Sequence, residues 1–130
     1  SLPSLTHLNV DSNNLKTVSE LAFVPNICTL TARFNAIRSD RSATDPLFLP
    51  DVRTLSLDGN RLQHLQWLGG CPVIERVYAA RNVISGFPML PSLMVLDLPY
   101  NKIEDVSGLA MCPNLVAVRL DHNQLCSVAA

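Results

Sequence analysis

The chain has 130 residues, of which 48% are hydrophobic, and its ten Lys and Arg residues against eleven Asp and Glu residues give a formal net charge of −1. This length fits one domain with a substantial core, and no apolar run approaches the roughly 18 residues of a membrane-spanning helix. A balanced charge without a basic cluster argues against binding driven by nucleic-acid phosphates.

Two residue types recur along the chain at matching intervals. Prolines stand at Pro3, Pro25, Pro50, Pro72, Pro91 and Pro113, and asparagines at Asn13, Asn35, Asn60, Asn82, Asn101 and Asn123. Both series are spaced by 22, 25, 22, 19 and 22 residues, so each Pro precedes its Asn by ten. All length variation therefore falls after the Asn, which indicates one rigid element and one tolerant return segment in each repeat.

The constant half of each copy predicts a short strand. Two apolar positions recur in all six copies, first as Leu8, Leu30, Leu55, Val77, Leu96 and Val118, and then as Val10, Ala32, Leu57, Ala79, Leu98 and Leu120. Side chains two residues apart lie on one face of a strand, and a single copy cannot bury that face alone. We therefore expect the copies to stack as parallel strands. Each Asn amide is expected to bond the backbone of its own turn and of the next copy.

The variable half of each copy is expected to close the core. Its apolar residues fall into three columns: Val18, Leu65, Phe87, Val106 and Val128; Leu21, Leu68 and Leu109; and Val24, Leu49, Cys71, Leu90 and Cys112. Each return has room for a turn or a short 3-10 or α segment. The second return, residues 38–51, is polar and three residues longer, so it is expected to bulge outward as a tolerated insertion. The fourth return, residues 85–90, is three residues shorter and is expected to make the convex side narrower at this copy.

The six copies of L-x-x-L-x-L-x-x-N-x-L resemble the leucine-rich repeat family, in its short 22-residue class, over essentially the whole chain. The resemblance implies an α/β fold, a right-handed solenoid with a parallel concave sheet of about six strands and short 3-10 or turn segments on the convex side. Residues 1–130 then form one leucine-rich repeat domain. Neither end carries an evident cap, so we expect a longer protein, and self-association through the ends stays open.

The positions of the cysteines and histidines argue against a metal site or a catalytic site. Cys28, Cys71, Cys112 and Cys126 show no C-x-x-C spacing, and they are expected to be reduced and mostly buried. Together with the missing Asn-x-Ser/Thr sequon, this favours a cytoplasmic location. His7, His64 and His122 fall in different copies and do not converge on a metal. We expect no enzyme activity, no cofactor and no metal.

The outward side chains of the strands form the expected binding surface, because solenoids bind partners on their concave face. Arg and Tyr are enriched in interface hot spots, and the candidate partner-binding residues are Arg76, Tyr78, Arg81, Val95, Pro99, Tyr100, Phe34 and Arg119. An ordinary solvated sheet face is the competing interpretation. Arg33 and Arg119 are expected to pair with aspartates of neighbouring strands. Phe34 is either a separate anchor or packs beside Ile37, and the sequence leaves both open.

These features predict a protein–protein interaction scaffold that docks a partner on the concave sheet. Within the 22-residue class, the resemblance implies a cytoskeletal or ciliary assembly as the first interpretation. Three alternatives stay open: a regulatory subunit of a Ser/Thr phosphatase, a ribonucleoprotein subunit, and an extracellular internalin-like adhesin. We expect neither membrane insertion nor direct nucleic-acid binding.

Overall fold

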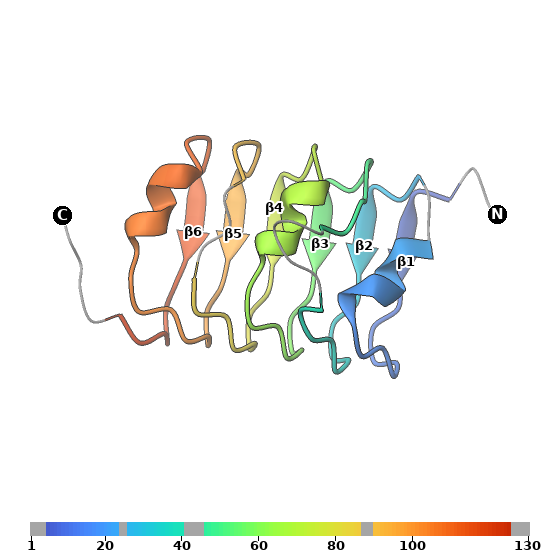
Figure 1. Cartoon of the computed structure of the whole chain (residues 1–130), viewed down its shortest axis with the longest axis horizontal. Coiled ribbons are helices and arrows are strands. Elements are labelled where there is room, and N and C mark those ends of the chain that lie inside the picture. Colours follow the sequence, from blue (N-terminus) through green and yellow to red (C-terminus); the bar gives the residue numbers. More distant parts are fainter. Residues whose placement is uncertain (1–4, 24–25, 41–45, 87–89, 126–130) are drawn as a thin grey trace.

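The computed structural model describes residues 5–23, 26–40, 46–86 and 90–125. Within these residues, six strands form one parallel sheet in chain order (Figure 1). They are β1 (His7–Asn9), β2 (Thr29–Thr31), β3 (Thr54–Ser56), β4 (Arg76–Tyr78), β5 (Val95–Asp97) and β6 (Ala117–Arg119). The central residues pair in register, Leu30 with Leu55 and Leu55 with Val77, and all three are fully buried. The leucine-rich repeat solenoid is therefore confirmed, with one strand in each of the six copies.

Three 3-10 helices lie in the returns of the described part: η1 (Val18–Phe23), η2 (Gln66–Gly70) and η3 (Ser107–Met111). In Figure 1, η1 and η2 pass in front of the sheet. We call the sheet face away from them the concave face. Val18, Leu65 and Leu68 are fully buried, as predicted, and pack in the same core as the strand residues. None of the described helices is both long and apolar enough to span a membrane. Of the predicted return residues, Val24, Phe87 and Val128 lie outside the described residues.

The repeated asparagines form the predicted ladder, but they reach to the preceding copy and not to the next one. Asn82 is 6% exposed. Its Nδ2 donates to the carbonyls of Leu57 (3.0 Å) and Ala79 (3.1 Å), and its Oδ1 accepts from the amide of Leu62 (2.9 Å). The carbonyl of Leu57 lies just past the end of β3, where the strand ladder no longer provides a donor. The amide of the following copy therefore takes the place of a ladder bond.

The ends of the second return pack onto the solenoid, so the prediction that the whole segment bulges outward is wrong for them. Asp40 accepts hydrogen bonds from the amide of Val18 (2.9 Å) and the hydroxyl of Ser19 (2.6 Å), at the start of η1. Leu47 is buried in the core, and so is Leu49, as its apolar column predicted. These contacts satisfy backbone donors of η1 and remove apolar surface from water, which favours packing over exposure. Residues 41–45 lie outside the described part, as do residues 87–89 of the short fourth return.

The cysteines of the returns are core residues. Cys71 and Cys112 are buried, as predicted, and Cys28 is half-buried. Burial raises the pKa of the Cys71 thiol to about 12, so this thiol is protonated at neutral pH and packs as a small apolar side chain. Cys126 lies outside the described residues.

Candidate functional site

The residue just before each ladder asparagine has a left-handed backbone conformation. These residues, which we call the rim column, are Ser12, Phe34, Gly59, Arg81, Tyr100 and His122, with φ angles from 56° to 71°. The left-handed region costs a non-glycine residue about 1–2 kcal/mol. Bonds between copies offset that cost, since the amide of Arg81 donates to the carbonyl of Pro99 (3.0 Å) and the amide of Tyr100 donates to that of Asp121 (3.1 Å).

Three rim-column side chains from the last three copies stack on one another. The guanidinium carbon of Arg81 lies 4.2 Å from the centroid of the Tyr100 ring. On the other side, the rings of Tyr100 and His122 are stacked, with centroids 4.3 Å apart and an interplanar angle of 6°. A guanidinium over an aromatic face and a parallel ring pair are both attractive arrangements. The stack holds an exposed tyrosine, 42% accessible, in a fixed position at the edge of the concave face.

The strands of the same copies supply two rows of outward side chains. Strand register pairs Arg76 with Val95, and Tyr78 with Asp97. It then places Arg119 of β6 beside Asp97. Arg76 is exposed, whereas Tyr78 and Val95 are half-buried. Among the described residues, no carboxylate oxygen lies within 4.0 Å of a guanidinium nitrogen of Arg76 or Arg81, so neither arginine forms an ion pair there. The face therefore carries two cations whose charge is not neutralised by a contacting acid.

Asp97 is the electrostatically unusual group of this face. Its Oδ2 lies 3.6 Å from Nη1 of Arg119, but its Oδ1 is buried and has no hydrogen-bond partner. Burial raises the pKa of Asp97 above its usual value, and repulsion from Asp58 and Asp121 adds to this, while Arg119 opposes it. An unpaired acceptor is costly to bury. Oδ1 is enclosed by the protein, so its missing hydrogen bond is a cost to stability and not a contact point for another molecule.

The first copies show a different arrangement, because Arg33 and Asp11 form an ion pair there. Nη2 of Arg33 lies 2.8 Å from Oδ2 of Asp11, and the Arg33 amide donates to Oδ1 of Asp11 (2.7 Å). Burial acts to raise the pKa of Asp11, but the hydrogen bonds from Arg33 outweigh it and hold this pKa below its usual value. The predicted ion pairs of Arg33 and Arg119 with strand aspartates are confirmed.

The candidate residues do not all meet. Arg81 and Tyr100 are in contact, and Arg76, Tyr78, Val95 and Arg119 lie on the adjoining strands. Pro99 is buried, so its expected place on the accessible surface is wrong. The hydrogen bond from Arg81 holds its carbonyl against the preceding copy. Phe34 packs over Gly59 of the next copy and lies three copies away from Tyr100. Assignment of these residues to partner binding stays a prediction.

The sequence interpretation did not select His122, Asp97 or Ala117. His122 was recognisable, because it occupies the rim position one copy after Tyr100, and aromatic rings at equivalent positions of adjacent copies lie within stacking distance. No sequence signal marks the unpartnered oxygen of Asp97. We call the following surface the C-terminal concave patch: Arg76, Tyr78, Arg81, Val95, Asp97, Tyr100, Ala117, Arg119 and His122. The described residues contain no cluster of three His, Cys, Asp or Glu side chains that would hold a metal ion.

The sequence of this chain is similar to those of known leucine-rich repeat proteins. A family model described as a leucine-rich repeat matches residues 1–18 and 90–112. The chain is 35% identical over 114 residues to a leucine-rich repeat-containing G-protein coupled receptor 5 of Xenopus tropicalis, and 34% identical to receptor 5A of Xenopus laevis. Each alignment covers 81% of this chain and 12% of the receptor, so the chain spans about an eighth of the length of these curated relatives.

Among solved structures, an internalin C2 of Listeria monocytogenes superposes on this chain. The superposition has a TM-score of 0.47 and 20% sequence identity, and it covers 95% of this chain and 74% of that chain.

Proposed function

Because this chain belongs to the leucine-rich repeat family, we propose that it is a protein-interaction scaffold that binds a protein partner on the C-terminal concave patch. The observation that carries the proposal is the meeting, on one face, of a preformed stack and of two arginines, Arg76 and Arg81, that have no contacting carboxylate among the described residues. A preformed stack loses little conformational entropy on binding. Solenoids bind partners through such extended concave surfaces.

The chemistry of the patch defines the partner that would fit it. Arg76 and Arg81 lack a contacting carboxylate among the described residues, so they favour an acidic side chain of the partner. Val95, half-buried on β5, offers an apolar contact beside Arg76. The partner is therefore a protein segment that presents a carboxylate beside an apolar side chain.

The test is affinity capture with matched variants, followed by mass spectrometry of the captured proteins. Arg76→Glu reverses one charge on the patch, and Lys102→Glu makes the same charge change at an exposed site on another edge of the solenoid. Tyr100→Ala removes the central ring of the stack, and Val83→Ala trims a comparably exposed apolar side chain elsewhere. All four variants are first checked for unchanged thermal unfolding.

The proposal expects a protein that is captured by the wild type, by Lys102→Glu and by Val83→Ala, and is lost with Arg76→Glu and with Tyr100→Ala. Reconstitution of that complex from the two purified proteins should show the same order of affinities. Capture that survives both patch variants, or that is lost equally with both controls, contradicts a concave-face site.

We also propose a cytoplasmic setting, in a cytoskeletal or ciliary assembly. The free cysteines of the described part, Cys28, Cys71 and Cys112, support a reducing compartment. Light microscopy of the tagged full-length protein tests this proposal, since it expects the signal on filaments or cilia. A signal confined to secretory compartments or to the cell exterior contradicts it.

A further inference from the structure

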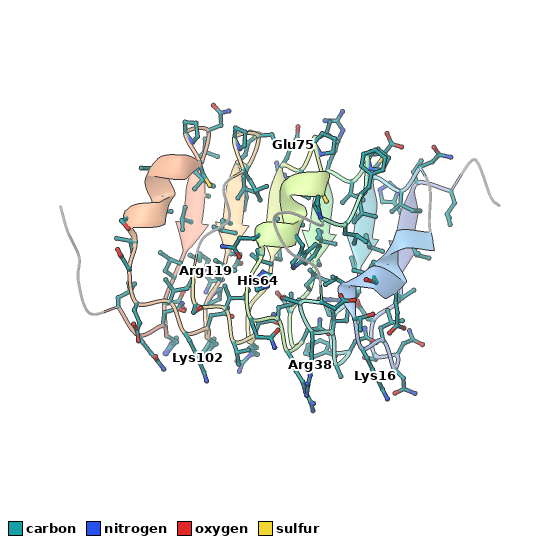
Figure 2. The ribbon with its side chains drawn as sticks, in the orientation of Figure 1. Lys16, Arg38, His64, Glu75, Lys102 and Arg119 are labelled. Carbon is teal, nitrogen blue, oxygen red and sulfur yellow. The ribbon has the colours of Figure 1, made fainter. Side chains whose placement is uncertain are left out.

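A hollow of about 410 Å³ lies on the edge of the solenoid where the first strands end, and it is lined by Lys16, Thr17, Ala36, Arg38 and Arg61. Figure 2 shows Lys16, Arg38 and Lys102 along this edge, with Glu75 at the opposite edge, where the strands begin. None of its lining residues belongs to the C-terminal concave patch. Its cationic residues come from three consecutive copies of the repeat.

The small side chain of Ala36 creates the space. The position directly after the ladder asparagine is filled by larger residues in the other five copies, namely Asn14, Arg61, Val83, Lys102 and Gln124. Backbone bonds fix the surrounding walls, because the amide of Arg38 donates to the carbonyl of Lys16 and that of Arg61 donates to the carbonyl of Ile37, both at 2.9 Å. The three cations thus surround a gap that a longer side chain at position 36 would fill.

No acid of the described residues forms an ion pair with the cations of the hollow, Lys16, Arg38 and Arg61. By contrast, Arg33 and Arg53 each contact a carboxylate. Two neighbouring acids make hydrogen bonds but no ion pair with these cations. Glu20 lies beside the hollow, where its Oε1 accepts from the amide of Lys16 (3.0 Å) and the hydroxyl of Thr17 (3.4 Å), and Asp40 accepts from the start of η1.

We propose that this hollow binds a phosphomonoester dianion. Two guanidinium groups donate paired hydrogen bonds that match phosphate oxygens, and a lysine adds a third positive charge. Three cations suit a dianion better than a single carboxylate, whose one charge leaves most of them uncompensated. The volume exceeds that of a phosphoryl group alone, so it also admits the atoms that carry it. The phosphoryl group belongs either to a phosphorylated side chain of a protein or to a small free phosphoester.

The test is isothermal titration calorimetry of the full chain at low salt, because screening weakens exposed charge interactions. Inorganic phosphate, phosphoserine amide and a phosphoserine peptide with its unphosphorylated counterpart are titrated in turn. Arg38→Gln/Arg61→Gln removes two cations and is expected to weaken binding at least about tenfold. Lys102→Gln removes a cation from the same edge outside the hollow and is expected to change the affinity less than about twofold.

A second variant separates the shape of the hollow from its charge. Ala36→Leu keeps every cation and fills the space, and it is also expected to weaken phosphate binding at least about tenfold. Circular dichroism confirms that each variant keeps the fold. Tighter binding of the phosphopeptide than of phosphoserine amide assigns the site to phosphoproteins, and equal binding assigns it to small phosphoesters.

Three results would overturn the proposal: no saturable binding of any phosphorylated probe to the wild type, equal weakening by Lys102→Gln, or unchanged binding in Ala36→Leu. The inference is independent of the proposed protein partner. Arg76→Glu, which alters the concave patch, is expected to leave phosphate affinity unchanged.

Discussion

The ring of Phe34 lies directly over the Cα of Gly59 in the next copy: a Cβ built on Gly59 would lie 2.6 Å from Cδ1 and 2.9 Å from Cε1 of Phe34. Both residues belong to the rim column, and Gly59 has a φ of 71°. The glycine therefore serves two purposes, since it adopts the left-handed turn without strain and leaves room for the ring. Phe34, 57% exposed, is fixed by this contact on one side only.

Gly59→Ala is expected to lower the free energy of unfolding by about 1–2 kcal/mol, because a side chain in the left-handed region is strained. A further loss arises from displacing the Phe34 ring. Chemical denaturation of Gly59→Ala, Phe34→Ala and the double variant separates the two effects, since the ring clash is absent when Phe34 is removed. If the alanine costs the same in both backgrounds, the ring swings aside freely and the packing role assigned to Phe34 is wrong.

The two glycines of η2 give a matched pair. A Cβ on Gly70 would meet the backbone carbonyl oxygen of Leu47 and lie 2.7 Å from its carbonyl carbon, whereas a Cβ on Gly69 meets nothing within 4 Å. Gly70→Ala is therefore expected to reduce stability by about 1–3 kcal/mol, the usual cost of overpacking. Gly69→Ala is expected to leave the melting temperature unchanged or slightly raised. Equal melting temperatures for the two variants would show that residues 46–49 do not pack on η2.

The asparagine ladder is expected to contribute most where it is buried. Asn82→Ala leaves the buried Leu62 amide without its side-chain acceptor, at about 1–3 kcal/mol. It also removes one of two side-chain donors to the Leu57 carbonyl, which keeps its hydrogen bond from Nδ2 of Asn60 (2.9 Å). Asn13→Ala is the control, because Asn13 is exposed and its Nδ2 donates to the carbonyls of Val10 and Asp11 in its own turn. Urea denaturation should therefore show a much lower midpoint for Asn82→Ala than for Asn13→Ala. Similar midpoints would contradict the role of the ladder in holding adjacent copies together.

Asp97 and Asp11 are expected to affect stability with opposite dependence on pH. The pKa of Asp97 is raised in the folded chain, so folding favours its protonated form, and its contribution to stability is present at low pH and lost as pH rises through the folded pKa. Asp97→Asn should therefore be more stable than the wild type near neutral pH. The gain should shrink as pH falls toward the usual carboxyl pKa of about 3.9.

Asp11→Asn is the matched control for this prediction. The pKa of Asp11 is lowered in the folded chain, so its contribution to stability is present above the usual carboxyl pKa and is lost as pH falls through the lowered value. This variant should be less stable than the wild type near neutral pH, with the difference vanishing in acid. Thermal unfolding of both variants between pH 3 and pH 7, roughly the range of carboxyl titration, measures the two slopes. Slopes of the same sign would contradict the contrast between the two sites.

Spacing along the chain was sufficient to predict the stacked strands. Apolar residues two apart, as at Leu55 and Leu57, lie on the same face of any strand, and the constant distance from Pro to Asn aligns that face in every copy. The length of the returns left a turn or a short 3-10 or α segment open, and three of the returns contain a 3-10 helix. The periodicity also predicted the ion pairs of Arg33 and Arg119, because equivalent positions of adjacent copies become neighbours. These are properties of position in the repeat, and the sequence by itself determines them.

Only the tertiary structure decided which side chains meet and which stay accessible. Pro99 occupies an outward position by count but is buried, while Ala36 opens a hollow because its neighbours are longer. Stacking of Arg81 on Tyr100 depends on the left-handed turn before each asparagine, which the bonds to the next copy impose. Repeat position fixes the direction of a side chain, but its contacts depend on the size, charge and conformation of the side chains in the copies on either side.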